Sequence, residues 1–176
     1  GLYFKGGTAL QKIFLNHSRL SEDIDYTATI EMEGAKRKIT EAIKASQLAT
    51  SITKDKDVEG FTRLVISYKG FGNEDGTVFI DLNKRATLLL KPERHEIQHF
   101  YPASIPTFSV NTLARDEMFA EKVAATVDRN KPRDHYDVYT MIKASLPINL
   151  ELVKQKCKQS GTEFNVQRMF SKADKL

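Results

Sequence analysis

Cysteine is nearly absent from this sequence, since Cys157 is the only one among 176 residues. A single thiol cannot build an internal disulfide framework, which suits the cytoplasm and predicts a cytoplasmic protein. Long apolar runs are also missing. The longest, such as residues 86–90, are far shorter than the ~20 residues that a membrane-spanning helix needs, so no membrane partner is expected.

Several motifs of common enzyme classes are absent too. The sequence has no Walker-type Gly-Lys-Ser/Thr loop, no Gly-x-Ser-x-Gly elbow and no pair of cysteines, which leaves P-loop NTPases, α/β-hydrolases and zinc ribbons unsupported. The net charge of +4 admits polyanionic partners. Acidic residues cluster in 21–33, whereas Lys and Arg crowd into 129–133 and 154–175. Such a distribution could hold metal ions in one place and phosphates beside it.

The sequence does contain a mixed α/β half followed by a helical half. Short apolar runs and alternation predict strands over 2–5, 23–29, 61–68, 77–82, 86–91 and 108–112. Helical spacing predicts helices over 8–16, 35–51, 114–128, 133–144, 150–158 and 164–172, the second with Leu48 on its apolar stripe. This order predicts an α+β fold, with residues 1–112 as an α/β core and residues 113–176 as a helical region.

Gly6, Gly7 and Thr8 lie between the first predicted strand and the first predicted helix. Glycines let the backbone approach a ligand closely, and the start of a helix offers free N–H groups to an anion. The Thr8 hydroxyl could cap the helix or bind a phosphate. A tight turn without any ligand is the alternative interpretation.

Three aspartates are candidates for a metal site. Asp23 and Asp25 are two residues apart in a predicted strand, so both carboxylates emerge on one face. Two like charges that close need a cation or protons between them, and Mg²⁺ or Mn²⁺ prefers carboxylate oxygens. Asp81, within an apolar strand, could complete a three-carboxylate site or face water. A solvent-facing edge strand would also explain the first two.

Charged residues on the predicted helices leave a similar choice open. Glu117 and Glu121 share a helical face, and Lys122 is rotated from it by about 100°. A solvated face with salt bridges would explain all three. Asp134 and Asp137 open the next helix and suit its N-terminal dipole.

In combination these motifs resemble the AbiEii/AbiGii toxin-like nucleotidyltransferases of the DNA-polymerase-β-like nucleotidyltransferase superfamily. The first signature of that family resembles residues 4–10 and 19–26, where Gly-Gly-Thr-Ala-Leu precedes Ser-Glu-Asp-Ile-Asp. Its later signatures resemble residues 120–125, 128–129 and 133–139. With Asp81, four blocks occur in the family's order over roughly residues 2–140.

The resemblance implies a nucleotidyltransferase-type mixed sheet flanked by helices and a metal-dependent nucleotidyltransferase activity. It implies Mg²⁺ or Mn²⁺ as cofactor and a nucleoside triphosphate as substrate. The residues that it assigns are Gly6, Gly7, Thr8 and Lys122 for nucleotide binding, Asp23, Asp25 and Asp81 for the metal, Asp23, Asp25, Lys122 and Asp134 for catalysis, and Arg133 and Asp137 as supporting residues.

The family resemblance also implies a toxin of a toxin–antitoxin or phage-defence system. Such a toxin would transfer a nucleotide to an RNA acceptor, with tRNA as the first choice, and would be paired with a cognate antitoxin protein. Modification of a protein hydroxyl, or nucleotide binding without chemistry, remain as alternatives. Family members usually carry helical sequence before the Gly-Gly strand and continue further after residue 137, so we expect a trimmed or processed chain, or an unusually short relative.

Overall fold

The computed structural model describes residues 1–70, 72–129 and 131–171, which form seven strands and six helices. The strands are β1 (Leu2–Lys5), β2 (Ile24–Ala28), β3 (Ala49–Val58), β4 (Phe61–Lys69), β5 (Asp75–Asn83), β6 (Glu93–Glu96) and β7 (Ser109–Thr112). The helices are α1 (Gly6–Ile13), α2 (Met32–Ser46), α3 (Arg115–Asp128), α4 (Pro132–Lys143), α5 (Leu150–Gln159) and α6 (Val166–Phe170). Within the described ranges, no helix has the length and apolar character needed to cross a membrane.

All seven strands belong to one mixed sheet, in the order β3-β4-β5-β2-β1-β7-β6. Strand β2 is parallel to β5, and β1 is parallel to β7. The other neighbouring pairs are antiparallel. The mixed sheet with flanking helices confirms the predicted α+β fold.

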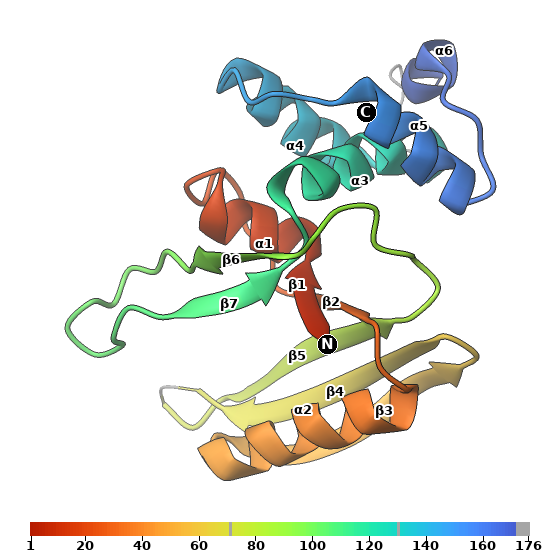
Figure 1. Cartoon of the computed structure of the whole chain (residues 1–176). Helices are drawn as coiled ribbons and strands as arrows, with labels where there is room; N and C mark the ends of the chain where they lie inside the picture. The colour runs from red at the N-terminus through yellow and green to blue at the C-terminus, as the bar shows by residue number, and fades with distance from the viewer. Residues whose placement is uncertain (71, 130, 172–176) are drawn as a thin grey trace.

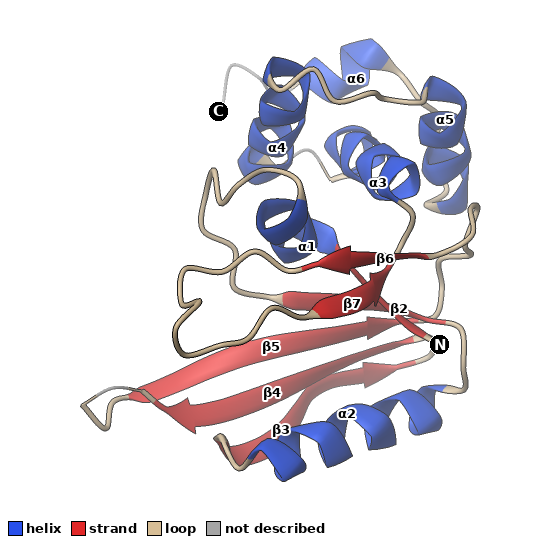
Figure 2. Cartoon of the chain, turned by 60° about the vertical axis from the view of Figure 1, so that its left-hand side comes forward, coloured by secondary structure: helices blue, strands red, loops and turns tan. Residues whose placement is uncertain are grey.

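Helix α2 covers one face of the β3–β5 part of the sheet, whereas the other helices gather on the opposite side of the molecule (Figures 1 and 2). Successive residues of a strand point to opposite faces. Leu64, Ile80 and Leu82 therefore pack with Ala35 of α2 in one buried cluster. Alternate residues of β4 and β5 point the other way, toward the side on which α3 lies.

A second buried cluster joins the centre of the sheet to the helical layer. Phe4 of β1 and Leu10 of α1 pack with Leu113, with Phe119 of α3 and with Met141 of α4. Burial of large apolar side chains is the main stabilising contribution of such a cluster. Because its members come from both sides of residue 112, the two predicted regions share this core. Their boundary stays a prediction.

The predicted strand over residues 86–91 is wrong, and the short strand β6 follows it instead. Leu88 and Leu89 pack against two different buried clusters, which explains why the run is apolar. The backbone N–H groups of Leu89 and Leu90 donate to the Glu117 carboxylate, at 3.0 and 2.8 Å. A buried side chain therefore takes the place of a neighbouring strand.

The predicted helix over residues 35–51 is wrong in its limits, because α2 begins at Met32 and ends at Ser46. Gln47 adopts the left-handed conformation, with φ 57°, which ends the helix. Leu48, predicted on the apolar stripe, is 76% exposed. Strand β3, which starts at Ala49, was not predicted, because this edge strand is mostly exposed and has no apolar alternation. The last predicted helix extended to residue 172, which lies outside the described residues.

Candidate active site

A cavity of about 720 Å³ lies between the sheet and the helical layer. Nine basic and five acidic residues line it, so the cavity combines groups for phosphates with groups for cations. The predicted site residues on its wall are Gly6, Gly7, Asp23, Asp25, Asp81, Lys122 and Arg133. Thr8, Asp134 and Asp137 are buried behind the wall.

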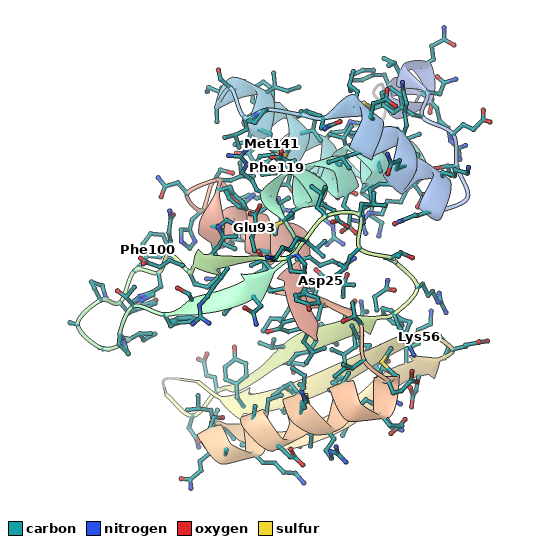
Figure 3. The ribbon with its side chains drawn as sticks, viewed as in Figure 1. Asp25, Lys56, Glu93, Phe100, Phe119 and Met141 are labelled. Atoms are coloured by element: carbon teal, nitrogen blue, oxygen red, sulfur yellow. The ribbon has the colours of Figure 1, made fainter. Side chains whose placement is uncertain are left out.

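Strand register brings the predicted carboxylates together. Asp25 is paired in register with Asp81 across the parallel β2–β5 pair and with Lys5 across the antiparallel β1–β2 pair. Residues in register on neighbouring strands point to the same face. Asp25 therefore lies between a cationic and an anionic side chain, where the sheet meets the helices (Figure 3).

Asp25 is half-buried, and its carboxylate is not neutralised by an ion pair within the described part of the chain. No hydrogen bond or ion pair to its carboxylate occurs among the described residues. Burial raises the pKa of Asp25 above its ordinary value, the charge of Lys5 opposes that shift, and the charges of Asp81 and Asp23 add to it. A carboxylate in this position gains from a cation nearby.

Asp81, by contrast, is held by an arginine that the sequence analysis missed. The Arg63 guanidinium donates from Nε and Nη2 to the two carboxylate oxygens of Asp81, each at 2.7 Å. The carboxylate raises the pKa of Arg63 in turn. Arg63 occupies the alternate position between the buried Thr62 and Leu64, and this placement on the face away from α2 was the available signal.

The Gly-Gly turn leaves room for the acidic cluster. Gly6 has φ +78°, in the left-handed region, and a Cβ added there would overlap the Asp25 carboxylate. A Cβ at Gly7 would come within 2.9 Å of Arg19 Nη2 and of Ser21 Oγ. Position 6 therefore needs glycine on two independent grounds, whereas a side chain at Gly7 would require the Arg19 and Ser21 side chains to move.

Thr8 lies behind this turn with its hydroxyl already engaged. The hydroxyl bonds to the backbone carbonyl of Asp23 and lies 3.0 Å from Ser21 Oγ. It therefore ties α1 to the segment that carries Asp23. Its contact with a nucleotide stays a prediction.

Lys122 extends from α3 to the cavity wall and is held by two aspartates of α4. Its Nζ lies 3.0 Å from Asp134 Oδ1 and 2.9 Å from Asp137 Oδ2. The side chain of Lys122 is 6% exposed and both aspartate side chains are fully buried. Asp134 and Asp137 thus fix the position of the ammonium group, so both act on the cavity through Lys122.

Two arginines complete the pairing of these aspartates. Arg129 donates to both oxygens of Asp134, and Arg19 donates to both oxygens of Asp137 at 2.6 Å. Burial alone would raise the pKa of Asp134, but the hydrogen bond from Arg129 and the charge of Lys122 outweigh it and lower that pKa. Each of these two aspartates is therefore bound by an arginine as well as by Lys122.

A chain of charged residues lies on the other side of the cavity, and the interpretation of its glutamates as a solvated face is wrong. Glu117 and Glu121 do not form a solvated face, because Glu117 is fully buried and both bind Lys156 of α5, at 2.5 and 3.1 Å. Glu121 also binds Lys5, at 3.3 Å. Lys156 lies three and four residues after Val153 and Leu152 on the buried stripe of α5, which was the signal for its burial.

A divalent cation needs several oxygen ligands held close together. The described residues contain no group of three or more His, Cys, Asp or Glu side chains arranged to hold a metal ion. Asp23 and Asp25 nevertheless both line the cavity. A carboxylate has about four lone-pair sites, of which Arg63 uses two at Asp81. Oxygen ligands from these three residues fit Mg²⁺ or Mn²⁺.

Comparison with known protein families agrees with the resemblance seen in the sequence. A family model described as "Nucleotidyl transferase AbiEii toxin, Type IV TA system" matches residues 1–175. No curated protein matches the chain.

Solved structures share the fold. MenT4, a nucleotidyltransferase toxin from Mycobacterium tuberculosis H37Rv, superposes with a TM-score of 0.72 at 22% identity, over 95% of this chain and 62% of MenT4. JHP933 from Helicobacter pylori has a TM-score of 0.65 at 20% identity, over 99% of this chain and 68% of JHP933. A third structure, named "putative nucleotidyltransferase from H. pylori", has a TM-score of 0.63 at 20% identity, over 99% of this chain and 70% of that protein. The chain thus spans about two thirds of the length of these structures.

Proposed function

This chain belongs to the AbiEii nucleotidyltransferase toxin family of type IV toxin–antitoxin systems, and from that premise we propose that it transfers a nucleotide from a nucleoside triphosphate to an RNA acceptor. We take tRNA as the acceptor. The proposal includes a cognate antitoxin protein that binds the toxin, and a cytoplasmic location, where both RNA and nucleotides are available.

One observation carries the proposal. The Asp25 carboxylate has no partner among the described residues, lies in register with Asp81, and is approached by a glycine turn, all on the wall of a cavity rich in Lys and Arg. Buried acids without partners are costly, so they are typical of functional sites. Acidic side chains that can bind a cation lie beside basic side chains that can bind phosphates. This arrangement suits a phosphate-bearing substrate that binds together with a cation.

The chain's own residues would bind and orient the nucleotide. The turn at Gly6 and Gly7 lets the triphosphate approach the first N–H groups of α1, where the helix dipole favours an anion. Lys122, fixed by Asp134 and Asp137, would contact a phosphate and stabilise the pyrophosphate that leaves. Because its position is set before the substrate binds, little reorganisation is needed during the reaction.

Arg133 would add a second cationic contact, since it is exposed and lines the cavity. Arg63 would hold Asp81 in a fixed orientation. Asp23, Asp25 and Asp81 would hold Mg²⁺ or Mn²⁺, and the bound cation would neutralise triphosphate charge and activate the attacking hydroxyl. Transfer of a nucleotide would then depend mainly on positioning and electrostatics.

The test is incubation of the protein with each radiolabelled nucleoside triphosphate, Mg²⁺ and total tRNA, followed by gel separation. We expect a labelled RNA band that disappears in excess chelator and falls on the order of a thousandfold or more in Asp25→Asn. Asp75→Asn is the matched control, because Asp75 is an exposed aspartate at the far end of β5 from Asp81. This control should retain wild-type transfer.

The other outcomes favour the alternatives. Label on protein and none on RNA would favour modification of a Tyr, Ser or Thr hydroxyl. Nucleotide binding without any labelled product would favour a module that has lost its chemistry. Wild-type transfer by Asp25→Asn, or transfer that persists in excess chelator, would remove the proposed metal site.

A further inference from the structure

A second cavity of about 570 Å³ adjoins the candidate active site. It is lined by Arg19, Pro132, Arg133, His135, Tyr136 and Tyr139. Two of these residues, Arg19 and Arg133, also line the first cavity. The second cavity therefore lies next to the candidate site, and a pair of arginines contributes to the walls of both.

The walls of this second cavity are aromatic and exposed. Tyr136 and Tyr139 lie three residues apart on α4, with 43% and 60% of their surface exposed. Neighbouring residues at this spacing share one helical face. Large exposed aromatic side chains that share a cavity are typical of a binding surface.

Two side chains of this surface, Tyr136 and Arg19, are held in position before any ligand binds. The Tyr136 hydroxyl donates to the Ser18 carbonyl at 2.9 Å, which ties α4 to the segment after α1. Arg19 is held by the two oxygens of Asp137. Rigid aromatic and guanidinium groups lose little entropy when a flat ligand binds. Such planar groups are those on which unpaired nucleic-acid bases stack.

We propose that this second cavity binds an unpaired nucleotide of the acceptor RNA, with its base on Tyr139 and Tyr136 and its phosphate on Arg133. The inference rests on the proposed function and adds the position of the acceptor strand. A single-stranded end is required because bases inside a duplex are already stacked on each other. The shared arginines would place the reacting end of that strand in the first cavity.

The test is fluorescence anisotropy with a labelled single-stranded RNA oligonucleotide of mixed sequence. Tyr139→Ala should weaken binding about tenfold, because a stacked base is lost. Tyr139→Phe keeps the ring and should bind as the wild type does. Tyr101→Ala is the matched control, since Tyr101 is 63% exposed on the loop between β6 and β7.

The salt dependence of RNA binding distinguishes the phosphate contact of Arg133 from the stacking contact of Tyr139. Arg133→Gln should weaken binding and reduce the slope of log Kd against log salt concentration by about 0.7, the value for one phosphate of a single strand. Tyr139→Ala should leave that slope unchanged. An RNA duplex should bind without any dependence on Tyr139.

Three results would overturn the proposal: no binding of the oligonucleotide, equal binding by Tyr139→Ala, or a dimer in sedimentation that Tyr139→Ala dissociates, which would assign the surface to a second copy. The outcomes also separate the two proposals. RNA binding through Tyr139 without nucleotide transfer would refute the proposed function alone. Transfer to RNA with an unchanged KM for RNA in Tyr139→Ala would refute this surface alone.

Discussion

Two groups of buried or half-buried acids flank the candidate site, and they are neutralised to different extents. The sheet carboxylates are Asp23, Asp25 and Asp81, and the helix carboxylates are Asp134, Asp137, Glu117 and Glu121. Each helix carboxylate is bound by at least one Lys or Arg. Of the sheet carboxylates, only Asp81 has such a partner among the described residues.

This difference in pairing indicates different roles for the two groups: the unpaired acids can bind a ligand, and the paired acids hold other side chains in position. A buried acid with a matched cation stabilises the position of that cation, and removing either partner is costly. A buried acid without a cation costs stability until a ligand supplies the charge. The helix carboxylates therefore hold Lys122 and Lys156 in place, whereas Asp23 and Asp25 are left to interact with something that binds.

The largest expected effect comes from breaking the helix group. Asp137→Ala should lower the free energy of unfolding by about 3–5 kcal/mol, the cost of leaving a buried cation without its partner. Arg19 would lose both of its bonds to a carboxylate, and Gln11 would lose one more. Urea denaturation measures the change.

Asp75→Ala is the control for this prediction. Asp75 pairs with Lys69, but its side chain is 82% exposed, so the loss should be far smaller. Equal losses in the two variants would show that burial of the helix carboxylates makes no difference to stability.

A smaller loss of stability is expected when a side chain is added next to the sheet carboxylates. Gly6→Ala should cost roughly 1–2 kcal/mol, because an L-residue is strained in the left-handed region, and it should reduce transfer by displacing the Asp25 carboxylate. Gly34→Ala in α2 meets no atom within 4 Å and should instead stabilise by roughly 0.5–1 kcal/mol. Thermal melting compares the two variants. A neutral Gly6→Ala would mean that the turn tolerates a side chain.

The smallest expected effect is on the pH dependence of folding stability, which has opposite signs for Asp25 of the sheet group and Asp134 of the helix group. The raised pKa of Asp25 gives stability that is present below the ordinary value of 3.8 and is lost as pH rises through the folded-state pKa. The lowered pKa of Asp134 gives stability that is present above the ordinary value and is lost as pH falls through the folded-state pKa.

Near neutral pH, Asp25→Asn should therefore melt slightly above the wild type and Asp134→Asn below it. The Asp25 difference should shrink on acidification toward the ordinary carboxylate pKa, whereas the Asp134 difference should shrink only below that pKa. Melting curves across this pH range measure them. A lower melting temperature for Asp25→Asn at neutral pH would mean that its charge is already compensated in the folded protein.

The local motifs were predictable from the sequence, and the partners of their residues were not. Gly6, Gly7, Asp23, Asp25 and Asp81 line one cavity, and the motifs that contain them could be found because a turn and strand alternation depend only on neighbouring residues. Their roles in nucleotide and metal binding stay predictions. Arg63 was missed because its bond to Asp81 depends on the register between β4 and β5. Glu117 and Lys156 were missed because two distant helices must pack before their charges meet.

The wrong strand over residues 86–91 has a similar cause. Apolar composition indicates burial, but it does not say which group binds the backbone. Here Glu117 binds the N–H groups that a neighbouring strand would otherwise bind. A short apolar run therefore predicts contact with the core and leaves its secondary structure open.

The pairing of Arg19 with Asp137 joins residues that are 118 positions apart, and that of Lys5 with Glu121 joins residues 116 apart. A ribosome makes the early partner several seconds before the late one, at ~5–20 residues per second. During that interval the nascent chain has the Gly-Gly turn, Asp23 and Asp25, but neither Lys122 nor the helices that fix it. If the protein acts on tRNA, the ribosome that makes the toxin is thus exposed to it only after most of the chain has been translated.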